Sequence, residues 1–215
     1  KYFCVSTDKA TYPVNMMGAS KRIMENFLLD PKHKINVSTT RFANVAFSDG
    51  SLLHGFKKRI EKRQPIVAPR DIKRYFITPE ESGQLCLLSC LMGKKDQIYY
   101  PIIKNNLKLI SFSDIAINFI NQIGYEYYPC KSEEEAKNSF FNLINTNKWP
   151  CYFFKSDTTG EKYFEEFFET DDETDENSFK NIGIVKNCKK MYKDYDFFLN
   201  SLNEIKKNNK WTKIE

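Results

Sequence analysis

The fold is decided near the start of the chain, in the stretch "YFCVSTDKATYPVNMMGASKRIMENFLLDPKHKINVSTTRF", residues 2–42. Residues 2–5 are a short apolar run that predicts a buried strand, and residues 35–42 are rich in β-branched side chains and predict another. Between them, residues 19–29 carry apolar side chains at helical spacing. Strand, helix and strand in this order predict a right-handed parallel crossover and therefore an α/β fold.

The middle of the chain contains the signals of further helices. Turn residues 48–51 precede apolar residues at helical spacing and predict a loop that leads into a helix N-terminus, where backbone donors favour an anion. Thr78 as N-cap, with Glu81 three residues later, predicts a helix that begins with a capping box. Another helix is predicted with its cap near Ser113 and its end at Gly124.

The C-terminal part of the sequence gives weaker signals. Residues 125–178 are aromatic and acidic, and we predict that they are loop-like. Within them the run "EEFFETDDETDE", residues 165–176, is typical of a solvated or mobile segment. Residues 189–211 predict an amphipathic, lysine-rich helix.

Composition argues against several classes of function. The chain of 215 residues has 33 basic and 28 acidic residues and a net charge of +5, without a long basic stripe, so we expect no nucleic-acid binding. The longest apolar run, near residues 85–92, is far shorter than the ~20 residues that cross a bilayer. The start "KYFCVS" has no secretory pattern and resembles a cut inside a strand. We therefore expect a cytoplasmic protein with no membrane segment.

The cysteines and histidines show no metal-binding pattern. Six cysteines are scattered along the chain without a C-x-x-C pair, and only two histidines are present. We therefore expect reduced thiols and no metal site.

A candidate site follows the two predicted strands. In an open α/β sheet, ligands bind beyond the carboxyl ends of the strands, which is where Ser6–Lys9 and Asn44–Ser51 fall. A carboxyl beside an ammonium can act as an acid and base pair, as Asp8 beside Lys9 suggests, although an Asx turn with a surface lysine is the alternative. Arg74 could bind a phosphate or form a surface ion pair.

Three blocks of the sequence carry a resemblance to a known family. They are "VSTDKATYPVNMMGASKRIME", "RFANVAFSDGS" and "PIVAPRDIKRYFITPEESGQL", and a fourth segment, "WPCYFFKSDTTGEKYFEEFF", resembles the C-terminal region of one branch. The blocks resemble nucleotide-sugar 4,6-dehydratases of bacterial polysaccharide biosynthesis, within the extended short-chain dehydrogenase/reductase group, and most of all UDP-N-acetylglucosamine 4,6-dehydratases. The resemblance implies a UDP-sugar substrate, NAD or NADP as cofactor, and a homo-oligomer.

The resemblance also implies the roles of individual residues. Thr7 would hydrogen-bond O4 of the sugar, Asp8 would be the acid at the departing C6 hydroxyl, and Lys9 would be the base that takes the C5 proton. Elimination of water needs such an acid and base. Lys21 would bind the ribose of the nicotinamide and take up the proton released when the sugar hydroxyl is oxidised.

Further residues would complete the cofactor and substrate sites. The resemblance implies contacts with the nicotinamide pocket from Phe42, Ala43 and Val45. It implies substrate contacts, mainly to the diphosphate, from Asn44, Ser48, Ser51 and Arg74.

The sequence departs from the family pattern at two points. The glycine-rich turn that would hold the cofactor pyrophosphate is absent, so NAD or NADP would be bound mainly by a segment outside this chain. Met17 stands where the family motif usually has a tyrosine four residues before the lysine. Some of these dehydratases resemble this chain in having a methionine at that position. We therefore include Met17 in the catalytic set together with Thr7, Asp8, Lys9 and Lys21.

The resemblance predicts the C-terminal part of a Rossmann-like parallel sheet with a smaller substrate-binding lobe. The expected divisions are the end of the Rossmann-like domain with the catalytic motif (1–45), substrate-binding and returning sheet segments (46–125), and a C-terminal extension (126–215). Two other functions stay open. A nucleotide-sugar epimerase or reductase could use the same scaffold, but a simple 4-epimerase does not need the Asp8 and Lys9 pair. A noncatalytic nucleotide-sugar-binding remnant would fit the missing cofactor half and Met17.

Overall fold

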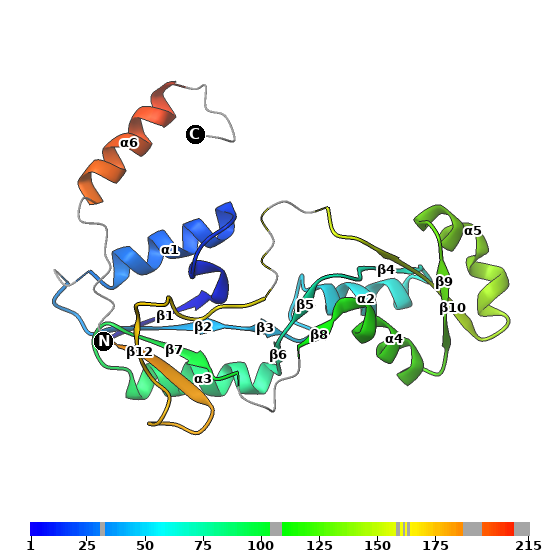
Figure 1. Ribbon diagram of the computed structural model, residues 1–215, viewed down its shortest axis with the longest axis horizontal. Helices are drawn as coiled ribbons and strands as arrows, with labels where there is room; N and C mark the ends of the chain where they lie inside the picture. Colours follow the sequence, from blue (N-terminus) through cyan, green and yellow to red (C-terminus); the bar gives the residue numbers. More distant parts are fainter. Residues whose placement is uncertain are drawn as a thin grey trace.

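The chain folds around two β-sheets that lie towards opposite ends of its long axis (Figure 1). The computed structural model describes residues 1–30, 33–103, 109–157, 160, 162, 164–186 and 195–208. The larger sheet has five strands and the smaller has three. The α/β class predicted from the sequence is confirmed.

The larger sheet has the strand order β1-β2-β7-β12-β11. Its strands are β1 (Tyr2–Thr7), β2 (Val37–Phe42), β7 (Gln97–Pro101), β12 (Ile182–Lys186) and β11 (Glu173–Asp175). β1 pairs parallel with β2, Cys4 lying opposite Thr39, and β2 pairs parallel with β7. β12 and β11 follow in antiparallel pairs. The predicted parallel neighbours are therefore confirmed.

Helices cover both faces of this sheet. α1 (Met16–Leu28) lies above it and α3 (Pro79–Met92) below it in Figure 1. α3 begins with the predicted capping box at Thr78. α1 begins three residues before the predicted start, because the side chain of Asn15 accepts the backbone N–H of Gly18 and caps the helix at residue 15.

β2 is polar in sequence yet buried throughout most of its length, and the polar groups have partners. The hydroxyls of Ser38, Thr39 and Thr40 donate to backbone carbonyls at 2.9–3.0 Å. Arg41 donates to both carboxylate oxygens of Glu25 on α1, at 2.9 and 2.7 Å. These bonds remove the penalty that unpaired polar groups would carry in a core.

The smaller lobe has the strand order β4-β10-β9, all parallel. Its strands are β4 (Ile66–Pro69), β10 (Lys148–Phe154) and β9 (Glu126–Cys130), and its helices are α2 (Leu52–Glu61), α4 (Phe112–Gln122) and α5 (Glu133–Ile144). Its core consists of buried apolar side chains, among them Leu53, Phe56, Ile66, Ile120, Phe140 and Trp149. Ser51 caps α2, and Ser111 caps α4 two residues before the predicted Ser113.

The prediction that residues 125–178 are loop-like is wrong. β9, α5 and β10 lie within this range. The aromatic residues pack against one another: the Trp149 ring contacts the rings of Tyr125 and Phe140 edge to face, at centroid distances of 5.0 and 5.2 Å. Three of the acidic residues stand in the first turn of α5, where the helix dipole favours them.

Short strand pairs connect the two sheets. β3 (Asn44–Val45) pairs with β6 (Phe76–Ile77), and β5 (Lys73–Arg74) pairs with β8 (Ile110–Ser111). They lie between the larger sheet and the smaller lobe (Figure 1). Asn44 and Arg74 are therefore held at the junction.

The predicted C-terminal helix is present as α6 (Tyr195–Asn208). Residues 187–194 and 209–215, which include the ends of the predicted helix, lie outside the described residues. In Figure 1, α6 stands apart from both sheets.

Gly18→Ala tests how closely α1 is packed against the turn after β1. A Cβ on Gly18 would overlap the carbonyl oxygen of Lys9, so we expect a loss of about 1–3 kcal/mol in the free energy of unfolding. In the control Gly83→Ala, on α3, the new Cβ meets nothing within 4 Å, so helix propensity should add about 0.5–1 kcal/mol. Urea unfolding measures both, and equal responses would contradict the packing.

Candidate active site

The site is built on the turn that follows β1. Thr7 ends the strand, and residues 8–10 form a short 3-10 helix, η1 (Asp8–Ala10). The Thr7 hydroxyl donates to Oδ1 of Asp8 at 2.7 Å, and the Lys9 ammonium donates to the same oxygen at 3.2 Å. Asp8 is buried, whereas the Lys9 side chain is 29% exposed. An acid and a potential base therefore share one hydrogen bond at the end of a strand.

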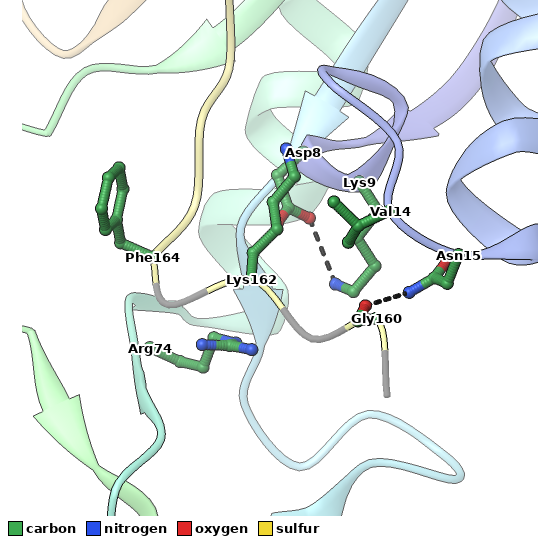
Figure 2. A pocket seen from close by; sticks show the side chains of 8 residues that line it. All are labelled: Asp8, Lys9, Val14, Asn15, Arg74, Gly160, Lys162 and Phe164. Carbon is green, nitrogen blue, oxygen red and sulfur yellow. Dashed lines mark hydrogen bonds and ion pairs between the residues drawn. The ribbon is translucent and has the colours of Figure 1, made fainter. Parts of the chain in front are cut away.

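A small cavity lies against this pair (Figure 2). It is lined by Asp8, Lys9, Val14, Asn15, Arg74, Gly160, Lys162 and Phe164. Figure 2 shows the Lys9 ammonium turned towards the Asp8 carboxylate, with Arg74 on the other side of the cavity. The amide of Asn15 donates to the carbonyl of Gly160 at 3.0 Å, which joins the start of α1 to the C-terminal segment.

Three cationic side chains surround the cavity: Lys9, Arg74 and Lys162. Arg74 is 7% exposed and donates through Nη1 to the carbonyl of Lys73 at 2.7 Å. Lys162 donates to the carbonyl of Thr11 and pairs with Glu166 at 3.2 Å. Cations converging on one cavity suit a phosphate-containing ligand.

Glu165 lies next to Arg74 and is not among the residues predicted from the sequence. Its Oε1 accepts from the Asn44 amide at 2.5 Å and from the backbone N–H of Tyr75 at 3.1 Å, and it lies 4.0 Å from Nε of Arg74. Its Oε2 is buried and has no hydrogen-bond partner among the described residues. The prediction of a solvated acidic run is therefore wrong at Glu165, which is 5% exposed.

Burial raises the pKa of Glu165 to about 7. The Arg74 guanidinium lowers this pKa and the Asp8 carboxylate raises it, and both effects are smaller than that of burial. The segment's resemblance to a family region was the one signal that could have pointed to Glu165. Its place in a run of acidic residues concealed it.

The predicted substrate residues divide into two groups. Arg74 lines the cavity, and Asn44 reaches it indirectly through Glu165. Ser48 instead donates to the carbonyl of Val45 at 2.9 Å within its own turn, and Ser51 accepts the N–H of His54 as the cap of α2. Neither serine lines this cavity.

The predicted cofactor residues do not line this cavity, and three of them lie in or against the core. Ala43 is buried, and Phe42 and Val45 pack against the same apolar cluster. Lys21 donates to the carbonyl of Val5 at 3.4 Å, beside a Val5 side chain that is itself exposed. Met17, in the first turn of α1, is 52% exposed and is not among the residues lining the cavity.

These residues fit one end of NAD or NADP. The ammonium of Lys21 beside the exposed Val5 offers a donor and an apolar surface near Thr7, which suits a ribose and a nicotinamide. The exposed α1 start, with Met16 and Met17, adds apolar surface at this position.

No metal-binding cluster of histidine, cysteine, aspartate or glutamate occurs among the described residues. Cys130 and Cys151 are buried free thiols, while Cys188 lies outside the described residues. Within the described ranges, no helix combines the length and apolar character needed to cross a bilayer.

Comparison with known proteins places the chain in a family. A family described as polysaccharide biosynthesis protein matches residues 1–187. This chain belongs to that family. The probable polysaccharide biosynthesis protein EpsC of Bacillus subtilis is 30% identical over 154 residues, which make up 68% of this chain and 25% of EpsC. The chain thus spans about a quarter of that relative's length.

Other similar proteins include a UDP-glucose 4-epimerase and a dTDP-glucose 4,6-dehydratase. UDP-glucose 4-epimerase of Rickettsia bellii is 31% identical over 155 residues, 64% of this chain and 45% of that protein. The structure of Pen from Bacillus thuringiensis matches with a TM-score of 0.65 at 19% identity, covering 88% of this chain and 53% of that one. DesIV of Streptomyces venezuelae, a dTDP-glucose 4,6-dehydratase solved with NAD, matches at 0.53 and 12%, covering 77% and 50%. These structures share the Rossmann-like fold.

The titration of Glu165 predicts a pH-dependent stability. Its pKa is about 7 in the folded state and near 4.5 when unfolded, so the folded state holds the proton more tightly. Wild type should therefore lose up to about 3 kcal/mol of stability from this group as pH rises from about 4.5 to 7. Glu165→Gln cannot ionise at this position, so it should not show this loss of stability.

Urea unfolding of wild type and Glu165→Gln at about pH 5 and pH 8 measures the effect. Glu133→Gln is the control, because Glu133 forms a surface pair with Lys137 on α5 at 2.8 Å. The stability of wild type relative to Glu165→Gln should be lower at about pH 8 than at about pH 5. A difference that does not change with pH would contradict the titration.

Proposed function

We propose that this chain supplies the acid–base and substrate-binding residues of an NAD(P)-dependent nucleotide-sugar 4,6-dehydratase. The substrate would be UDP-N-acetylglucosamine or a related UDP-N-acetylhexosamine, in bacterial surface polysaccharide biosynthesis. The observation that carries the proposal is the hydrogen-bonded set of Thr7, Asp8 and Lys9 beside a cavity with three cations. Family membership supports the polysaccharide context.

Substrate binding would use the cations of the cavity. The diphosphate of a UDP-sugar carries two negative charges that Arg74 and Lys162 can meet. Asn44, oriented by Glu165 at 2.5 Å, would stand beside the diphosphate as a polar neighbour. We propose the same substrate role for Ser48 and Ser51, through the N-terminus of α2 that Ser51 caps.

Bound NAD or NADP would supply the hydride acceptor and donor that the reaction requires. The chain's own residues would handle the protons. Thr7 would hydrogen-bond the sugar O4, and Lys9 in its neutral form would take the proton from C5. Asp8 in its protonated form would give a proton to the hydroxyl that leaves C6 as water. Lys9 would return its proton to C5 when the hydride adds at C6, and a proton from solvent would restore Asp8, balanced by the proton that O4 releases.

Met17 cannot accept the proton that O4 releases on oxidation, because a thioether neither gives nor takes a proton. Another group must accept it. We propose that Lys21 takes this role in addition to holding the cofactor ribose. Phe42, Ala43 and Val45 would form the wall of the nicotinamide pocket, Ala43 from within the core.

The second candidate is a nucleotide-sugar epimerase. The likeness to the Rickettsia UDP-glucose 4-epimerase favours it. A 4-epimerase needs no acid and base for elimination at C5 and C6, so the Asp8–Lys9 pair favours the dehydratase. We propose in addition a cytoplasmic location and a homo-oligomeric assembly for the complete protein.

Lys9→Ala and Asp8→Asn in the complete protein should abolish dehydration, because each removes a proton-transfer group. Affinity for the UDP-sugar should stay within about tenfold. Arg74→Ala should act in the opposite sense and weaken binding by about 1–3 kcal/mol. The measurements are release of the 4-keto-6-deoxy sugar with added NAD or NADP, and calorimetric binding.

Lys58→Ala is the control for these variants, because Lys58 forms an exposed pair with Glu61 on α2. It should change neither turnover nor affinity. Retained turnover in Lys9→Ala would refute the proposed base, and turnover to a 4-epimer alone would favour the epimerase.

Met17→Leu tests whether the site works without a phenol. Leucine has a similar volume and is equally aprotic, so turnover should stay within about tenfold, less than ~1.4 kcal/mol of barrier. If the site has decayed, wild type should be inactive. Met17→Tyr should then restore turnover, because it places a phenol one helical turn before Lys21. Activity confined to the tyrosine variant would favour a noncatalytic remnant.

A further inference from the structure

Glu165 has the geometry of a residue that controls Arg74. The two side chains come from segments about 90 residues apart, and both are nearly fully buried. Arg74 lines the cavity, while Glu165 does not. Glu165 lines a separate hollow with Tyr12 and Tyr100, and its carboxylate lies 4.0 Å from Nε of Arg74, so it would act on a ligand in the Asp8–Arg74 cavity through Arg74.

The two carboxylate oxygens of Glu165 have unequal surroundings. Oε1 accepts from Asn44 and from the backbone of Tyr75, whichever protonation state the acid has. Oε2 is buried without a hydrogen-bond partner among the described residues, so a negative charge there is poorly compensated. A proton placed on Oε2 would remove that charge and leave the hydrogen bonds of Oε1 intact.

Charged and titratable groups surround Glu165 on several sides. Arg74 on β5 and Asp8 on η1 act on its pKa, and Tyr12, Tyr100, Glu166 and Glu176 line a hollow together with it. Lys9 and Lys162 lie around the cavity that Arg74 lines. The cations line the cavity, and the carboxylates of Asp8 and Glu165 already form ion pairs with Lys9 and Arg74. An incoming diphosphate would compete with these carboxylates for the same cations.

We propose that Glu165 is a positioning residue whose protonation accompanies the binding of the UDP-sugar diphosphate to Arg74. The inference rests on the proposed function, because it assumes that the cavity receives a nucleotide diphosphate. When ionised, Glu165 attracts the guanidinium and repels the ligand. When it takes up a proton from solvent, Arg74 is released to the phosphate oxygens and the local charge is balanced. Its pKa of about 7 places this exchange near neutral pH.

The test is calorimetric binding of UDP-N-acetylglucosamine to the complete protein. The diphosphate of this ligand is esterified at both ends and does not titrate near neutral pH. For wild type, the affinity should fall about tenfold from about pH 6 to pH 8, because above a pKa near 7 each pH unit changes proton occupancy about tenfold. Titrations in buffers of different ionisation enthalpy at about pH 8 should show uptake of about one proton per ligand.

Glu165→Gln imitates the protonated acid and keeps an acceptor for Asn44 and Tyr75. Its affinity should be the same at both pH values and close to that of wild type at the lower pH, without proton uptake. Glu133→Gln, on the surface of α5, should behave like wild type. The proton count of wild type alone decides the matter if Glu165→Gln fails to fold.

The outcomes separate this inference from the proposed function. Binding with no proton uptake and no pH dependence would overturn the inference and leave the proposed function standing. The same pH dependence in wild type and Glu165→Gln would also overturn it, because another group would then titrate. Absence of binding at both pH values would overturn the inference and the proposed function together.

Discussion

The buried ion pair between Arg41 and Glu25 holds the parts of the site in place. The two side chains are 1% and 2% exposed, and the guanidinium binds the carboxylate through two nitrogens. Arg41 also donates to the carbonyl of Phe167 at 2.6 Å, so β2, α1 and the segment that carries Glu165 meet at one side chain. Removing either charge would leave the other buried and unpaired, which typically costs about 3–5 kcal/mol. A neighbouring pair, Arg22 and Glu169 at 2.6 Å, ties α1 to the same segment.

The parts of the site that follow from local sequence were predictable. Asp8 and Lys9 are adjacent and directly follow a strand, and their contact needs only the turn that Thr7 begins. Arg74, which was predicted from its sequence block, lines the cavity. Glu165 and Lys162 were not found, because their role depends on contacts with residues some 90 to 150 positions away. Such contacts leave no periodic signal in a single sequence.

The fold was predictable where strand and helix signals alternate. The crossover from β1 through α1 to β2 and the capping box of α3 agree with the sequence pattern. A smaller lobe was predicted, but its strands and helix within residues 125–178 were not, since β10 pairs with β4 and β9 from two separate regions of the chain. Its aromatic residues suggested irregular structure, whereas tertiary packing around Trp149 determines strands there.

The long sequence separations across the cavity also determine when it can form. Asn15 meets Gly160 across 145 positions, and Arg41 meets Phe167 across 126. Closing such loops is slow compared with forming a crossover of neighbouring elements. During synthesis β1, α1 and the Asp8–Lys9 pair leave the ribosome before Gly160, Lys162 and Phe164, which line the same cavity, are translated. A chain that stops before residue 160 therefore carries the acid, the base and Arg74 but lacks the segment that encloses them.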